Sequence, residues 1–263
     1  MSAEAKVRLQ TLLADARSDE PSRHADLARQ LQAPEVLEVL DSRADYVNAA
    51  KFRLRVAQVA EALAKNPAAS ARDAFLALTG SDFFVANDER TMSLVRASVS
   101  LRPAPPALVT FWDRRSQPDD GFTPTTITVL IENGSRPALE LFERKMADPV
   151  HEDDDKIAWM RTRVLGHRND VALLETCHRL MQGKLPERLQ PLLVEVLFDY
   201  RPAEWFRPTS SASAPPLESA SRDALDRLLE IGVVALTMVR LSDEQRSVVK
   251  LRLQDAEKLR ART

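Results

Sequence analysis

Apolar residues recur every three or four positions along most of the chain. One such series comprises Val56, Val59, Ala60 and Leu63, and another lies within residues 189–197. This spacing places apolar side chains on one face of an α-helix and leaves the other faces polar. The pattern therefore predicts an all-α protein built from amphipathic helices.

Glycines and prolines divide this pattern into segments. Several glycines follow an apolar series, where a residue in the left-handed conformation ends a helix: Gly80, Gly134, Gly166 and Gly183. Several prolines precede one, where the missing N–H has no cost: Pro34, Pro106, Pro124 and Pro137. Asn87, Asn169 and Ser242 are expected N-caps, and Ser242 with Gln245 forms a capping-box pattern.

The helical segments also repeat along the chain. When residues 138–146 are shifted forward by 35 positions, four residues meet identical ones: Leu139, Glu140, Arg144 and Met146 coincide with Leu174, Glu175, Arg179 and Met181. Residues 157–165 match residues 189–197 when shifted by 32 positions. Segment 125–131 is rich in β-branched residues and taken alone could form a strand. We predict a helix there because its neighbours repeat as helix pairs.

These repeats resemble the compact HEAT-like repeats of bacterial proteins. The resemblance covers residues 72–200 as four antiparallel pairs: 72–79 with 88–101, 106–115 with 125–131, 137–147 with 156–165, and 169–181 with 187–199. A more degenerate pair is expected at 34–45 with 51–65. The resemblance implies an α-solenoid, in which stacked pairs share one core that no single pair could bury.

The segments outside the array define the remaining organisation. We expect N-terminal capping helices at 1–33, the HEAT-like array at 34–206, a linker or exposed loop at 207–221, and a helical hairpin at 222–263. The linker is rich in Ser, Ala and Pro. The hairpin either caps the array or supplies a surface for a homodimer, and we favour the cap.

Composition agrees with a folded helical protein and narrows the class of partner. Apolar residues make up 44% of the chain, which suffices for a core, while Lys+Arg 37 and Asp+Glu 39 give a net charge of −2. A protein that binds mainly to phosphate backbones usually has a basic excess. The start of the chain lacks a signal-peptide pattern and the longest apolar stretch, 231–239, is shorter than a membrane span, so we expect a soluble, cytoplasmic protein.

Few residues suggest chemistry. His151 precedes the acidic run 152–155, but consecutive loop residues point in different directions, so a solvated loop is favoured over an ion site. Cys177 and His178 are adjacent on a predicted helix and point about 100° apart, which does not suit a nucleophile and its base. No glycine-rich phosphate loop, His-Glu-x-x-His or Cys-x-x-Cys pattern occurs in the sequence. We expect no catalytic residues, no metal site and no cofactor.

Arginines and aromatic residues are the candidates for partner binding. In HEAT-like arrays the second helices of the pairs line the concave face, and five arginines lie on or near them: Arg90, Arg96, Arg161, Arg163 and Arg168. Such arginines suit an acidic peptide or a nucleic acid. Trp205 and Phe206 lie between two prolines and could anchor a partner, whereas Trp112 and Trp159 are expected in the core.

The function favoured by these features is a non-catalytic protein–protein interaction adaptor that uses the solenoid surface. The alternative is a nucleic-acid-binding protein similar to the HEAT-like DNA-alkylation-repair glycosylases, in which a basic concave groove holds DNA. A third possibility, implied only by the resemblance, is an accessory lyase that attaches a chromophore, and no residue here recommends it.

Overall fold

The computed structural model describes residues 3–41, 54–81, 88–198 and 215–262 of the chain. Within these ranges the regular structure is helical throughout, and no strand occurs, which confirms the all-α class. None of the helices in these ranges has both the length and the apolar character needed to cross a lipid bilayer. The chain forms two compact units, Met1–Ser116 with Gly121–Val129 and Gln117–Asp120 with Leu130–Thr263.

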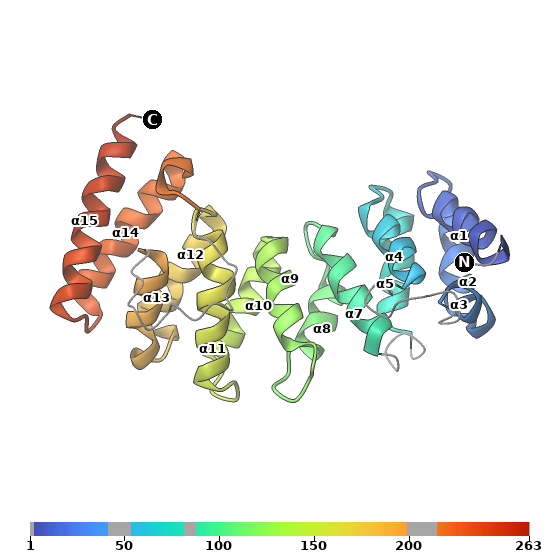
Figure 1. The fold of residues 1–263 in the computed structure, drawn as a ribbon, viewed down its shortest axis with the longest axis horizontal. Helices are drawn as coiled ribbons and strands as arrows, with labels where there is room; N and C mark the ends of the chain where they lie inside the picture. Colours follow the sequence, from blue (N-terminus) through green and yellow to red (C-terminus); the bar gives the residue numbers. More distant parts are fainter. Residues whose placement is uncertain (1–2, 42–53, 82–87, 199–214, 263) are drawn as a thin grey trace. The chain divides into compact units, whose positions relative to one another are not determined.

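Unit 1 contains the N-terminal helices (Figure 1). These are α1 (Ala3–Ala16), α2 (Pro21–Gln30), α3 (Pro34–Leu40), α4 (Arg55–Lys65), α5 (Ala69–Thr79), α7 (Asp88–Ala97) with the 3₁₀ turn η3 (Ser98–Ser100), α8 (Pro106–Arg114) and the first part of α9 (Thr123–Asn133). Pro21, Pro34 and Pro106 each occupy the first turn of a helix, where proline costs no hydrogen bond.

The helices of unit 1 pack in two rows. Helix α4 contacts α1 on one side and α7 on the other, while α5 contacts α2 and α8. Helix α4 also packs against α5, so each row covers the apolar face of the other. The core between the rows includes Leu63, Phe75 and Trp112, which are fully buried. The Trp112 indole N–H donates to Ser98 Oγ at 2.8 Å, which confirms the predicted core position of this tryptophan.

Unit 2 contains the remaining helices of the described chain (Figure 1). These are the end of α9, α10 (Arg136–Ala147), α11 (Asp153–Trp159) continued by the π-helical turn η4 (Met160–Val164) and by η5 (Leu165–His167), α12 (Val171–Arg179) continued by η6 (Leu180–Lys184), η7 (Glu187–Leu189), α13 (Gln190–Leu197), η9 (Leu217–Ser219), α14 (Arg222–Met238) and α15 (Asp243–Arg260). Gly183 ends the segment after α12 with a φ of 111°, a conformation that suits glycine.

Packing in unit 2 again joins alternate helices. Helix α12 contacts α10 on one side and α14 on the other, and α13 contacts η4. The C-terminal hairpin therefore packs through α14 onto α12 and α13. Helix α15 packs on α14, and Gly232 allows this because a Cβ there would lie 2.3 Å from Leu253 Cδ2. The division between the units falls within the segment 34–206 that the sequence analysis predicts as one array.

Several local predictions are confirmed. Segment 125–131 is helical and lies inside α9, although its β-branched residues alone favour a strand. Ser242 caps α15, and a full capping box with Gln245 is present. Trp159, the other tryptophan expected in the core, is 4% exposed.

Other local predictions are wrong. The acidic residues Asp153, Asp154 and Asp155 do not lie in a loop but form the first turn of α11, where carboxylates are stabilised by the helix dipole. His151 is 2% exposed and packs edge-on against Trp159, so it is not part of a solvated loop. Helix α12 is capped by Asp170, which accepts from Leu173 N–H, rather than by Asn169. Asn87 lies outside the described residues.

Candidate binding pocket

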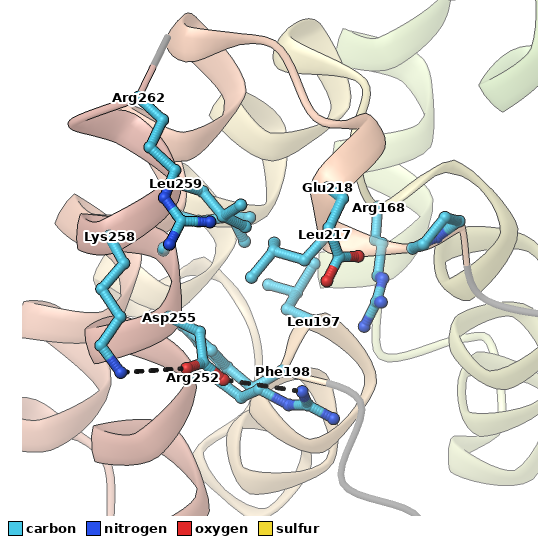
Figure 2. Close-up of a pocket in the computed structure, with 13 residues that line it drawn as sticks. Arg168, Leu197, Phe198, Leu217, Glu218, Arg252, Asp255, Lys258, Leu259 and Arg262 are labelled. Carbon is cyan, nitrogen blue, oxygen red and sulfur yellow. Dashed lines mark ion pairs between the residues drawn. The ribbon is translucent and has the colours of Figure 1, made fainter.

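The C-terminal helix of unit 2 forms one wall of a pocket of about 390 Å³ (Figure 2). We call it the α15 pocket. Its other walls come from the end of α13, from α14 and from the segment around η9. The residues that line it are Arg168, Leu197, Phe198, Pro216, Leu217, Glu218, Leu228, Arg252, Asp255, Ala256, Lys258, Leu259 and Arg262.

The inner surface of the α15 pocket is apolar. Leu197, Phe198, Leu228 and Ala256 are each less than 5% exposed and belong to the core of unit 2. Leu217 and Leu259 are partly exposed and extend this surface toward the opening. Figure 2 shows Leu217 and Leu197 between α15 and Arg168. A ligand with an apolar group would therefore meet an apolar surface that is already folded.

Charged side chains surround this surface, and basic residues predominate. Four basic residues and two acidic residues line the pocket. Asp255 lies between two of the cations, 4.0 Å from Arg252 Nη1 and 3.8 Å from Lys258 Nζ. Both distances are at the limit of an ion pair and the side chains are partly exposed, so these contacts are weak. Arg262 forms no ion pair in the described part of the chain, and Figure 2 shows its guanidinium next to Leu259.

Two neighbouring side chains hold the η9 wall in place. The Arg168 guanidinium donates from Nε and Nη2 to the carbonyl of Pro215, at 3.1 and 2.7 Å. Asn169 Nδ2 donates to the carbonyl of Pro216 and to Ser219 Oγ, both at 3.0 Å. Arg168 is 6% exposed and acts mainly as a structural clamp. The wall of the pocket is therefore fixed before any ligand binds.

The predicted partner-binding residues do not form a single site. Arg168 lines the α15 pocket, and Arg96 lines a different hollow in unit 1. Arg161 is half-buried and Arg163 is exposed on η4, and neither lines the pocket. Trp205 and Phe206 lie outside the described residues.

Arg90, another predicted partner-binding residue, turns toward the interior of unit 1. Its Nε lies 3.9 Å from Asp41 Oδ2, and both side chains are largely buried. The other oxygen of Asp41 accepts from the backbone N–H groups of Arg55 and Val56, at 2.7 and 3.4 Å, so it caps α4. Burial raises the pKa of Asp41 and lowers that of Arg90, and their mutual attraction opposes both shifts. Arg90 is therefore part of a structural cluster.

The residues that could suggest catalysis are packed into the core of unit 2. Cys177 is fully buried, and desolvation raises the pKa of its thiol to about 12, so the thiolate is not formed at neutral pH. Burial lowers the pKa of His151, and neighbouring Lys145 adds to the effect. Among the described residues, no group of histidine, cysteine and carboxylate side chains is arranged to hold a metal ion. Cys177 and His151 are core residues of unit 2.

The sequence analysis missed the basic residues of α15. Arg252, Asp255 and Leu259 recur at three- and four-residue spacing, so they share one face of α15, and Arg262 follows in the turn after the helix ends. This spacing indicates a shared helix face, but a charged helix face usually contacts only solvent. The leucines that convert the face into a pocket come from α13, α14 and η9, and only the folded structure brings them together.

Comparison of the chain with models of protein families, with curated proteins and with solved structures gave no match.

Proposed function

We propose that this chain is a non-catalytic adaptor that binds another protein, and that the α15 pocket receives an acidic segment of that partner. The observation that carries the proposal is the combination of a leucine-lined inner surface with an opening where the basic side chains of Arg252, Lys258 and Arg262 outnumber the two acidic ones. An apolar anchor surrounded by complementary charge is the usual composition of a protein-binding site. The alternate packing of helices in each unit agrees with an α-solenoid, which offers extended surfaces for partners.

The segment that fits is short, with one or two apolar side chains and flanking carboxylates. An apolar side chain would pack on Leu197, Leu228 and Leu259. The carboxylates would lie near Arg262 and Arg252, where bidentate contacts are available. The pocket volume of about 390 Å³ lies within the range of sites that take ligands of this size.

Two acidic residues favour a peptide over a nucleic acid. Asp255 and Glu218 line the same opening, and they would repel a continuous row of phosphates. A peptide carries fewer charges, and its carboxylates can avoid these positions. The chain also has a net charge of −2, without the basic excess that is typical of nucleic-acid-binding domains.

Binding of defined probes tests the proposal. A labelled peptide that alternates leucine with glutamate is compared with its glutamine counterpart and with single-stranded and duplex DNA, by fluorescence anisotropy. We expect the acidic peptide to bind more tightly than the neutral one. Arg252→Glu with Arg262→Glu should weaken this binding about tenfold, since each substitution replaces attraction with repulsion.

Arg240→Glu is the matched control, because Arg240 is exposed at the opposite end of α15, in the turn that joins it to α14. It should bind the acidic peptide as the native chain does. Equal binding of acidic and neutral peptides would contradict the proposal. Tight, salt-sensitive binding of DNA that the pocket substitutions abolish would replace it with the nucleic-acid alternative.

A further inference from the structure

Unit 1 contains a second and larger hollow, of about 900 Å³, between α4 and α7. We call it the α4–α7 groove. Its apolar residues extend along both helices and include Leu54, Ala57, Met92 and Val99, with Phe122 at the side. It lies in a different unit from the α15 pocket and shares no residue with it. An inference about this groove is therefore independent of the function proposed for the pocket.

The two helices that form the groove run parallel. Asp41 caps the first turn of α4 through the backbone N–H groups of Arg55 and Val56, and it also pairs with Arg90 in the first turn of α7. The N-termini of both helices therefore meet at Asp41. At the other end, η3, which follows α7, packs against α4. The groove thus has an amino end and a carboxyl end.

The charges along the groove are separated between these two ends. Asp88 and Glu89 lie at the amino end, in the first turn of α7. Arg96 lies at the carboxyl end, in the last turn of α7. Lys65 is also at that end, where it pairs with Glu61 on α4. Asp88 and Arg96 are exposed and form no ion pair in the described parts of the chain. The groove therefore presents negative charge at one end and positive charge at the other.

The walls of the groove favour a helical occupant. An extended peptide binds most tightly by adding a strand to an open sheet edge, and both walls here are helices, whose backbone groups are already hydrogen-bonded. A helix brings its own satisfied backbone and needs only an apolar face. Met92 and Val99 are seven residues apart and span about 10 Å, which matches the reach of apolar residues at i and i+7 on a partner helix.

We propose that the α4–α7 groove binds an amphipathic helix of a partner protein, antiparallel to α4 and α7. Helices commonly carry acidic residues in the first turn and basic residues in the last turn. In the antiparallel orientation, the acidic start of the partner helix lies near Arg96 and its basic end lies near Asp88 and Glu89. In the parallel orientation, like charges would meet at the amino end. The groove therefore selects both the partner class and its direction.

Two synthetic helices with the same apolar face test the proposed direction. One has acidic residues in its first turn and basic residues in its last turn, and the other has these charges exchanged. With peptides of about twelve residues, we expect the first to bind the full chain about tenfold more tightly by calorimetry. The double variant Asp88→Arg with Arg96→Glu should reverse this preference. Equal affinities, an unchanged preference in the double variant, or no binding of either peptide at millimolar concentration would overturn the proposal.

Cross-linking measures the direction itself. Cys177 is fully buried, so a cysteine introduced at the surface can be labelled selectively. Gln58 lies in the first turn of α4, and Ser100 lies at the carboxyl end in η3. A peptide with an N-terminal bromoacetyl group should react with Ser100→Cys and not with Gln58→Cys. The reverse pattern would show a parallel helix and contradict the proposal. A peptide that carries the reactive group at its C-terminus is the control, and it should react with Gln58→Cys.

Discussion

The α15 pocket and the α4–α7 groove are both hollows beside exposed helices, but they are held open in different ways. A buried ionic cluster anchors the groove at its amino end, where Asp41 joins the start of α4 to Arg90 of α7. Close helix contact holds the pocket, since α15 approaches α14 at Gly232 and Arg168 clamps the η9 wall. One surface thus depends on paired charges, and the other depends on steric fit and backbone contacts.

The difference extends to the buried histidines of the two units. In unit 1, His24 is fully buried and both ring nitrogens have partners, with Nε2 2.8 Å from the carbonyl of Ser18 and Nδ1 2.8 Å from Ser70 Oγ. The carbonyl can only accept, so Nε2 donates to it, and the Ser70 hydroxyl is the partner of Nδ1. In unit 2, neither ring nitrogen of His151 has a hydrogen-bond partner among the described residues. Unit 1 therefore satisfies its buried polar groups more completely at these two positions.

The largest expected effect comes from removing the anchor of the groove. Asp41→Ala removes the cap of α4 and an acidic partner of the largely buried Arg90. We expect the free energy of unfolding of unit 1 to fall by about 3 kcal/mol. Hydrogen exchange by mass spectrometry should show faster exchange in α4 and α7, with unit 2 unchanged.

Asp41→Asn keeps an acceptor for the N–H groups and should recover part of the loss. Unchanged protection of α4 in Asp41→Ala would show that the cluster is not an anchor.

The histidines provide a matched pair of substitutions with opposite outcomes. His24→Phe leaves the Ser70 hydroxyl and the Ser18 carbonyl without this partner. We therefore expect the free energy of unfolding of unit 1 to fall by about 2 kcal/mol. His151→Phe keeps the edge contact with Trp159 and removes two ring nitrogens that have no hydrogen-bond partner among the described residues. We therefore expect the free energy of unfolding of unit 2 to rise by up to about 1 kcal/mol. Urea unfolding followed by hydrogen exchange separates the two units. If both substitutions lowered the free energy of unfolding by the same amount, the difference in hydrogen bonding between His24 and His151 would be contradicted.

His151 also predicts a pH dependence for unit 2. Burial and the nearby Lys145 and Lys156 lower the pKa of His151 in the folded state, while Asp148 and Asp155 oppose the shift. The unfolded state therefore takes up the proton first as pH falls below about 6.5. The stability of unit 2 should decrease from that pH down to the folded-state pKa, and His151→Phe should remove this component. Unfolding of the native chain and of His151→Phe, measured at about pH 7.5 and about pH 5.5, checks whether the stability of unit 2 falls at the lower pH.

The smallest expected effect concerns the contact that supports the pocket. A Cβ at position 232 would lie 2.3 Å from Leu253 Cδ2 and 2.9 Å from Leu253 Cγ, so Gly232→Ala should displace α15. Overpacking outweighs the gain in helix propensity, and we expect a net loss of about 1 kcal/mol. In a Leu253→Ala background the same substitution should be neutral or stabilising. Hydrogen exchange in α15 measures the effect of Gly232→Ala in each background. Equal effects in the native and Leu253→Ala backgrounds would exclude a direct contact between position 232 and Leu253.

Local structure could be predicted from the sequence wherever short-range rules decide it. The helix at α9 followed from its repeating neighbours, and the Ser242 cap followed from a four-residue pattern. The predicted loop at the acidic run is wrong because carboxylates also favour the first turn of a helix, and here they form the start of α11. Helix periodicity does not indicate which polar residue lies opposite another element, so the inward position of Arg90 was also missed.

The candidate site was harder to predict than the helices. Arg168 and Arg96 were identified as basic residues near second helices, but their different surroundings depend on tertiary contacts. Arg168 is a clamp on the carbonyl of Pro215, which lies 47 residues away in the sequence. The charged face of α15 that carries Arg252 has no feature in the sequence that sets it apart from a solvated helix face, and only the fold places the leucines of α13, α14 and η9 beside it.

Quantitative capture from nuclease-treated native lysate tests the central claim most directly. The native chain, the double variant Arg252→Glu with Arg262→Glu, and the control Arg240→Glu are used as parallel baits. The account predicts a stoichiometric protein partner that the native chain and the control retain and the pocket variant loses, and that the acidic leucine peptide displaces. Equal capture by all three baits, or the absence of any protein partner that the pocket variant loses, would contradict a protein-binding role for the α15 pocket.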